Sequence, residues 1–97
     1  MTVHRSEQVA SDLNTVWLSG AVDYGMLHAD RVIDRCEYIF GLLHDFPGIG
    51  TELEGFEPPI RFFPLQRYPY LVFYTIEPDG IRIVRVLHER RQAADHL

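Results

Sequence analysis

The chain has 97 residues, of which 46% are hydrophobic and 24% charged, as is ordinary for a soluble globular protein with one modest core. No apolar stretch approaches the roughly 18 residues that a membrane-spanning helix needs, and the N-terminus lacks the apolar segment of a signal peptide, so we expect a cytosolic protein with no membrane partner. The net charge of −5 argues against a main role in binding the phosphate backbone of nucleic acids, and we expect no direct DNA binding by this chain alone.

The first half of the chain predicts a short strand followed by two amphipathic helices. Residues 2–5 suit a strand, and Ser6 suits the N-cap of a helix over residues 7–22, because its side chain can accept a hydrogen bond from an early helical N–H. The apolar residues of this helix recur at helical spacing: Val9, Leu13, Val16, Trp17 and Gly20. A second helix begins near Met26 and ends at Phe46, and the short turn between the helices predicts an antiparallel hairpin.

The apolar pattern changes after the second helix. Residues 47–59 are rich in proline and glycine and predict a connecting loop. A period of two then predicts strands over residues 60–65, 68–76 and 81–88, the last two joined into a hairpin by a Glu-Pro-Asp-Gly turn. Strict alternation predicts one shared face on the last strand for Ile81, Ile83, Arg85 and Leu87.

These elements predict one α+β domain over residues 1–97. We expect an N-terminal strand and an antiparallel helical hairpin packed on a small antiparallel β-sheet, followed by a short C-terminal tail. No internal repeat, low-complexity segment or linker divides the chain.

Several stretches resemble, in order and spacing, the motifs of the RelE/ParE superfamily of bacterial toxins. Ala10-Ser11-Asp12-Leu13 with Val16-Trp17 resembles the opening of these toxins, and Leu42–Gly50 resembles the exit from their second helix. Residues 61–64, 70–74 and 83–88 resemble the sheet strands of these toxins. The tail from Arg90-Arg91-Gln92 to His96-Leu97 resembles their ending, with Gln92 where aspartate is commoner. The resemblance covers nearly the whole chain.

The resemblance implies the toxin of a type II toxin–antitoxin system, neutralised by a ParD-like antitoxin in a complex that is a heterotetramer or larger. Within the superfamily, ParE-like members poison DNA gyrase, whereas RelE-like members cut messenger RNA in the ribosomal A site. A shared fold does not separate these activities, because function resides in the site.

The site residues favour the gyrase target. Aligned on the strand motifs, Leu71 stands where RelE-like nucleases carry an arginine, Glu89 falls at or near their next basic position, and no tyrosine follows Tyr74. Together with the net acidity, these departures favour a gyrase inhibitor that is not an enzyme. Two alternatives remain open: a nontoxic homologue that only binds antitoxin, and an mRNA endonuclease that uses Arg61, Arg85 and His88.

The C-terminal half carries the predicted contacts with a target or partner. Residues 1–57 contain ten acidic residues and three arginines, whereas residues 58–97 contain four acidic residues and six arginines. Because guanidinium groups pair well with carboxylates, this half suits an acidic partner. We expect contacts from Arg85, His88, Arg90 and Arg91. Arg85 fits equally well as a half-buried residue paired with a helix carboxylate.

Apolar surface that the helices leave uncovered predicts a groove for an antitoxin segment that folds on binding. The groove residues we expect are Trp17, Phe62, Phe63 and Tyr70, although Trp17 also suits the core and either Phe62 or Phe63 should be buried. The five histidines lack metal-ligand spacing, so we expect no metal or cofactor. Cys36 lies on an apolar helix stripe and should be a buried, inert thiol.

Overall fold

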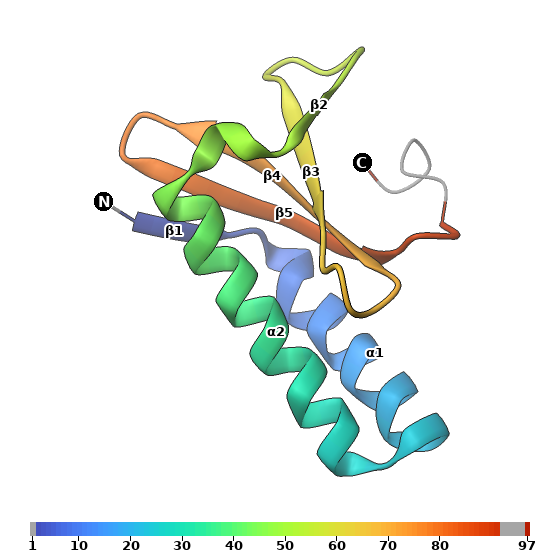
Figure 1. Ribbon diagram of the computed structural model, residues 1–97. Coiled ribbons are helices and arrows are strands. Elements are labelled where there is room, and N and C mark those ends of the chain that lie inside the picture. The colour runs from blue at the N-terminus through green and yellow to red at the C-terminus, as the bar shows by residue number, and fades with distance from the viewer. Residues whose placement is uncertain (1, 92–96) are drawn as a thin grey trace.

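The computed structural model describes residues 2–91 and 97, and in it two helices cover one face of a five-stranded sheet (Figure 1). The elements in chain order are β1 Thr2–Arg5, α1 Glu7–Tyr24, α2 Met26–Asp45, η1 Pro47–Ile49, β2 Thr51–Leu53, β3 Ile60–Pro64, β4 Tyr70–Glu77 and β5 Gly80–His88. The predicted α+β class and helical hairpin are confirmed. Within the described residues, no helix is long and apolar enough to cross a membrane.

The sheet is mixed, with the strand order β1-β5-β4-β3-β2. The N-terminal strand β1 pairs parallel to β5, whereas the other neighbours pair antiparallel, so the expected antiparallel sheet is extended by one parallel strand at this edge. Thr2 lies opposite Gly80, and a side chain at Gly80 would overlap the Thr2 carbonyl. At the other edge, β2 lies within the predicted loop, because three residues are too short to show a period of two.

A β-bulge interrupts the pairing of β4 with β5. Phe73 lies opposite Arg85 and Tyr74 lies opposite Ile83, so Val84 is the extra residue on β5. The bulge ends the predicted alternation, because Val86 continues the core face and Leu87 lies in the cluster on the other face of the sheet. Arg85 turns toward α1.

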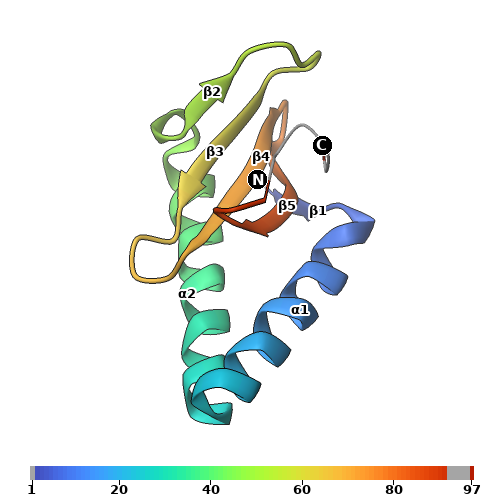
Figure 2. The ribbon, with the colours of Figure 1, turned by 90° about the vertical axis from the view of Figure 1, so that its right-hand side faces the viewer.

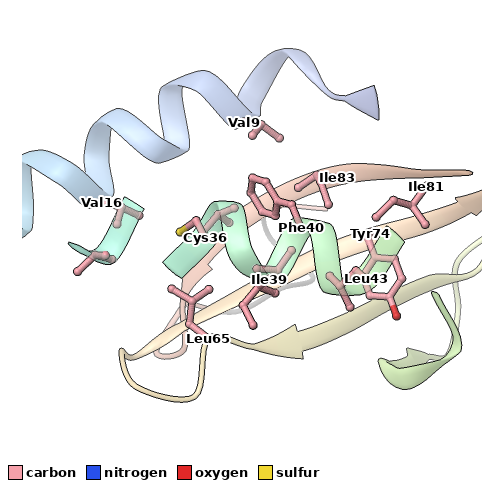
Figure 3. Packing of buried hydrophobic residues seen from close by; sticks show 13 residues of the cluster. Val9, Val16, Cys36, Ile39, Phe40, Leu43, Leu65, Tyr74, Ile81 and Ile83 are labelled. Atoms are coloured by element: carbon pink, nitrogen blue, oxygen red, sulfur yellow. The ribbon is translucent and has the colours of Figure 1, made fainter. Parts of the chain in front are cut away.

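The main core lies between the helical hairpin and the sheet. Figure 3 shows Cys36, Ile39, Phe40 and Leu43 of α2 packed toward Ile81, Ile83 and Tyr74 of the strands, with Val9 and Val16 of α1 alongside. The expected burial of Cys36 is confirmed, since its side chain is fully buried, and desolvation raises the pKa of its thiol to about 12. A smaller cluster of Ile60, Phe73 and Leu87 occupies the other sheet face, with Phe56 and Leu97 packed against it.

Tyr74 on β4 connects the segment after α2 to the sheet through two hydrogen bonds. Its buried hydroxyl donates a hydrogen bond to the Pro47 carbonyl at 2.7 Å and accepts one from the Gly50 N–H at 2.9 Å. A side chain at Gly50 would overlap the Tyr74 hydroxyl. Burial raises the pKa of Tyr74, so the phenol remains a neutral donor.

The outer end of the helical hairpin projects beyond the sheet (Figure 2). It presents exposed apolar side chains on both helices and at the turn between them: Leu18, Val22, Tyr24, Met26 and Leu27. Monomeric proteins rarely leave large apolar patches uncovered, so this end is suited to a protein contact.

Candidate functional site

Two adjoining hollows, with volumes of about 300 and 350 Å³, lie between α1 and the ends of β4 and β5. They share Val16, Ser19, Tyr70 and His88. The first hollow extends to Asp12, Arg85 and Arg91, and the second extends to Tyr24, His28 and Tyr68. Because they share one wall of α1, we treat them as a single groove, the α1 groove.

Asp12 and Arg85, which both line this groove, form a bidentate salt bridge. The Arg85 Nε and Nη2 donate to the two Asp12 carboxylate oxygens, each at 2.8 Å. Both side chains are largely withdrawn from solvent, with exposures of 9% for Asp12 and 17% for Arg85. The hydrogen bonds to Asp12 raise the pKa of Arg85, so the guanidinium stays charged. The structure therefore has Arg85 in the predicted pairing with a helix carboxylate.

The same region of α1 satisfies the backbone groups at the bulge. Asp12 also accepts a hydrogen bond from the Val86 N–H at 3.0 Å, and Ser6 donates through its hydroxyl to the Val84 carbonyl at 2.6 Å. The predicted N-cap bond of Ser6 is wrong, because that hydroxyl bonds the sheet and not the first turn of α1. Two side chains thus replace the ladder bonds that an extra residue disrupts.

Tyr70 and His88 form the centre of the groove. They lie opposite one another on β4 and β5, and their rings meet edge to face with centroids 5.4 Å apart. Both are half-buried. The His88 Nδ1 accepts the Arg90 N–H at 3.1 Å, and the His88 carbonyl accepts the Arg91 N–H at 2.9 Å. Arg90 and Arg91 are both exposed in this turn after β5, and Arg91 also lines the first hollow.

The predicted contact residues are therefore only partly brought together. Arg85, His88 and Arg91 line one hollow, whereas Arg90 does not. The rest of the predicted tail, residues 92–96, lies outside the described residues. Asp12, His28 and Tyr68 were missed as site residues. Asp12 carried a signal, because a charged residue three positions after Val9 and four before Val16 falls on an apolar stripe.

The candidate nuclease residues do not share a site. Arg61 donates to the carbonyls of Gly50 at 2.7 Å and Gly48 at 3.4 Å, so it anchors the segment before β2. Arg61 lies opposite Tyr74 in the middle of β4, whereas His88 lies opposite Tyr70, the first residue of that strand. Tyr74 and Tyr70 are four residues apart along β4, which corresponds to about 13 Å. Arg85 and His88 share the groove that Arg61 does not line.

The four predicted antitoxin-groove residues also lie on different surfaces. Tyr70 lines the α1 groove. Trp17 is half-buried, belongs to neither core cluster, and donates through Nε1 to Asp30 on α2 at 2.8 Å. Phe63 packs against the main core, and Phe62 packs on the opposite sheet face beside Phe73. The opposite orientation of the two phenylalanines is as predicted, but one groove does not contain all four residues.

Comparisons with known proteins decide the family. The model of a family described as ParE toxin of type II toxin–antitoxin system, parDE, matches residues 3–93. The chain belongs to this ParE family. It is 28% identical over 95 residues to Toxin ParE3 of Caulobacter vibrioides, an alignment that covers 98% of this chain and 93% of that protein. A solved structure, described as the chromosomal ParDE TA system from P. aeruginosa, matches with a TM-score of 0.75 at 21% identity, over 91% of this chain and 95% of that chain, which supports the fold.

Membership of the ParE family makes the chain the toxin component of a type II system, and an antitoxin is implied as its partner. The resemblance drawn from the sequence motifs is confirmed. Among residues 2–91 and 97, no group of three or more histidine, cysteine, aspartate or glutamate side chains is placed to hold a metal ion. The ParE chain offers instead a polar and aromatic groove suited to another protein.

Proposed function

We propose that this ParE-family chain inhibits DNA gyrase through protein contacts and is silenced when an antitoxin segment fills the α1 groove. The observation that carries the gyrase proposal is that both candidate nuclease arginines are engaged in structural bonds. Arg61 on β3 is held by two backbone carbonyls of the segment before β2, and Arg85 on β5 is held by Asp12 of α1, on the other side of β4. RNA cleavage needs a proton acceptor and cations around one phosphate, and these two cations are engaged elsewhere.

The groove has features of a peptide-binding surface. Its centre is the Tyr70–His88 ring pair, which offers apolar area with polar edges, and Arg91 borders one end. Aromatic and arginine side chains are the ones that most often dominate binding energy in protein interfaces. An antitoxin segment that orders on binding gains contacts along α1 on one side and the strand ends on the other.

A supercoiling assay tests the gyrase target. Purified toxin at increasing excess over gyrase should block supercoiling or trap a cleaved DNA complex, and added antitoxin should restore activity. The Arg91→Ala toxin should inhibit gyrase less well than the Arg82→Ala toxin. Arg82→Ala is the matched control, because it also removes one positive charge but at a residue that pairs with Glu77 near the turn between β4 and β5. Normal supercoiling at toxin excess sinks the proposal. Messenger RNA cut in codon register, and left intact by His88→Ala, would instead establish the ribosomal alternative.

The complex with antitoxin is proposed to be a heterotetramer or larger, with both chains in the cytosol. Light scattering on the co-purified complex gives its mass directly. A mass equal to one toxin and one antitoxin contradicts the heterotetramer without touching the gyrase target. The net charge of −5 also leads us to propose that the toxin alone does not bind DNA, which a duplex mobility-shift assay checks.

A further inference from the structure

A third hollow, of about 270 Å³, lies where α2 meets the turn between β3 and β4. Arg31, Asp34, Arg35, Arg67 and Tyr68 line it. Three guanidinium groups and one carboxylate give this small surface a positive charge, in a chain whose net charge is −5. We call it the arginine hollow.

Arg35 builds the hollow by joining its two walls. Its Nε donates to the Leu65 carbonyl and its Nη2 to the Gln66 side-chain oxygen, both at 2.9 Å. Its guanidinium also lies over the Tyr38 ring, 5.1 Å from the centroid. Gln66 has a φ of 77°, an uncommon left-handed conformation that the Arg35 bond helps to hold. The turn that carries Arg67 is therefore fixed against α2.

Arg31 and Arg67 differ from the other arginines near them. Both are exposed, and within residues 2–91 and 97 neither guanidinium makes a hydrogen bond or an ion pair. Each retains the planar set of donors that pairs with a carboxylate in two parallel hydrogen bonds. The hollow thus presents two unused anion-binding groups beside one that is already anchored.

The arginine hollow is continuous with the α1 groove. Arg67 and Tyr68 line both surfaces. Tyr68 is half-buried between them, with its ring edge to face against His28 of α2 at 5.5 Å. A chain lying in the groove can pass over Tyr68 and reach Arg31 and Arg67 without leaving the protein surface.

We propose that the arginine hollow binds carboxylate side chains of the antitoxin, on the segment that continues from the α1 groove. This inference rests on the proposed occupancy of that groove by the antitoxin. The segment would carry apolar residues where it meets Tyr70 and His88, and aspartate or glutamate where it meets Arg31 and Arg67. A long polyanion such as DNA is disfavoured, because the chain carries a net charge of −5 and a polyanion meets more of that charge than a short peptide does. A peptide needs only one or two carboxylates at the hollow and gains the rest of its affinity from apolar contacts.

Affinity measurements with matched charge variants test the proposal. Full-length toxin and its cognate antitoxin are combined at two salt concentrations, with toxin carrying either Arg31→Gln and Arg67→Gln or Arg5→Gln and Arg82→Gln. The second pair removes the same charge from the surface pairs with Glu37 and Glu77. The first pair should raise Kd about ten-fold or more and flatten its salt dependence, whereas the second should change Kd by less than about three-fold. Thermal unfolding checks that each variant folds. If a double variant does not fold, its two single substitutions are measured in its place.

Equal effects of the two double variants would overturn the proposal, because they would reflect overall charge. So would an unchanged antitoxin affinity, and a loss confined to binding of a duplex DNA probe would assign the hollow to nucleic acid instead. A Tyr70→Ala variant separates this inference from the proposed function. If Tyr70→Ala binds antitoxin normally while the Arg31 and Arg67 pair does not, groove occupancy fails and the carboxylate site stands. The supercoiling assay remains independent of both results.

Discussion

Asp12 on α1 accepts hydrogen bonds from the Arg85 guanidinium at 2.8 Å and from the Val86 N–H at 3.0 Å, so one carboxylate joins the helix to the bulged strand. The bulge frees these strand groups, and the helix satisfies them. Because Asp12 and Arg85 also line the α1 groove, the bond that holds the helix on the sheet shapes the candidate binding surface.

Asp12→Ala should lower the free energy of unfolding by about 3 kcal/mol, because it leaves Arg85 largely buried without its counter-charge and Val86 without an acceptor. Asp12→Asn should cost less, since it keeps an acceptor for Val86. Urea unfolding measures both. Asp23→Ala is the control, because Asp23 is exposed on the same helix and should change stability by no more than about 0.5 kcal/mol. Equal stabilities of the Asp12→Ala and Asp23→Ala variants would contradict this account.

Gly50→Ala should destabilise the fold by about 1–3 kcal/mol, because the new methyl group overlaps the Tyr74 hydroxyl and the Phe62 carbonyl lies close by. Gly48→Ala provides the matched control, since a side chain there meets nothing within 4 Å. Thermal unfolding of the two variants decides the matter. If both melt at the wild-type temperature, Gly50 is not required for the approach of Tyr74.

Tyr74→Phe should cost about 1–3 kcal/mol, because it removes the partner of the Pro47 carbonyl and of the buried Gly50 N–H. Chemical denaturation of the variant gives the value. Tyr38→Phe is the comparison, because Tyr38 is exposed on α2. A loss no larger than that of Tyr38→Phe would show that water replaces the hydroxyl.

Cys36 should resist thiol reagents in the native protein at pH 8 and react fully in urea, because burial raises the pKa of its thiol to about 12. In the unfolded chain the thiol has its ordinary pKa of 9.0, whereas the folded chain keeps the proton to higher pH, so the contribution to stability is complete below pH 9 and declines between 9 and about 12. The alkaline loss of stability should therefore be smaller in Cys36→Ala than in the wild type. Rapid native labelling at pH 8 is the contrary result.

Tyr70→Ala should weaken antitoxin binding about 30-fold, because the ring occupies the centre of the α1 groove. Trp17→Ala and Phe62→Ala should each change Kd by less than about three-fold, since neither residue lines the groove. Calorimetric titration with the cognate antitoxin makes the comparison. A larger loss from Phe62→Ala would move the antitoxin to the opposite sheet face.

The sequence pattern was sufficient for the helices and for most of the strands. The apolar stripe and the proline and glycine after Phe46 place α2 almost to the residue, and the turn before Gly80 identifies the β4–β5 hairpin. The pattern could not predict the bulge at Val84, because an extra residue in a strand leaves local composition unchanged. The parallel pairing of β1 with β5 is equally hidden, since it depends on a contact between the two ends of the chain.

The site was less predictable than the fold for a related reason. The motif residues Asp12 and Arg85 are 73 positions apart, and their pairing follows from the bulge that turns Arg85 toward α1. The expectation for Trp17 and Phe62 rests on the apolar surface that the helices leave uncovered, yet the groove depends on which face each residue takes. Arg67 gains its importance from a turn held by Arg35, which no local pattern indicates.

Asp12 both holds α1 on the sheet and lines the α1 groove, which affects how mutations selected in this toxin should be interpreted. A selection for cells that survive toxin expression without antitoxin should recover substitutions at Asp12 and Arg85, because breaking their bridge destabilises the packing of α1 on the sheet. Such survivors combine a change in the amount of folded toxin with any change in target contact. Arg91 and Ser19 also line the groove, and in the described part of the chain their side chains form no such bridge, so lost toxicity there at normal protein levels identifies the contact itself.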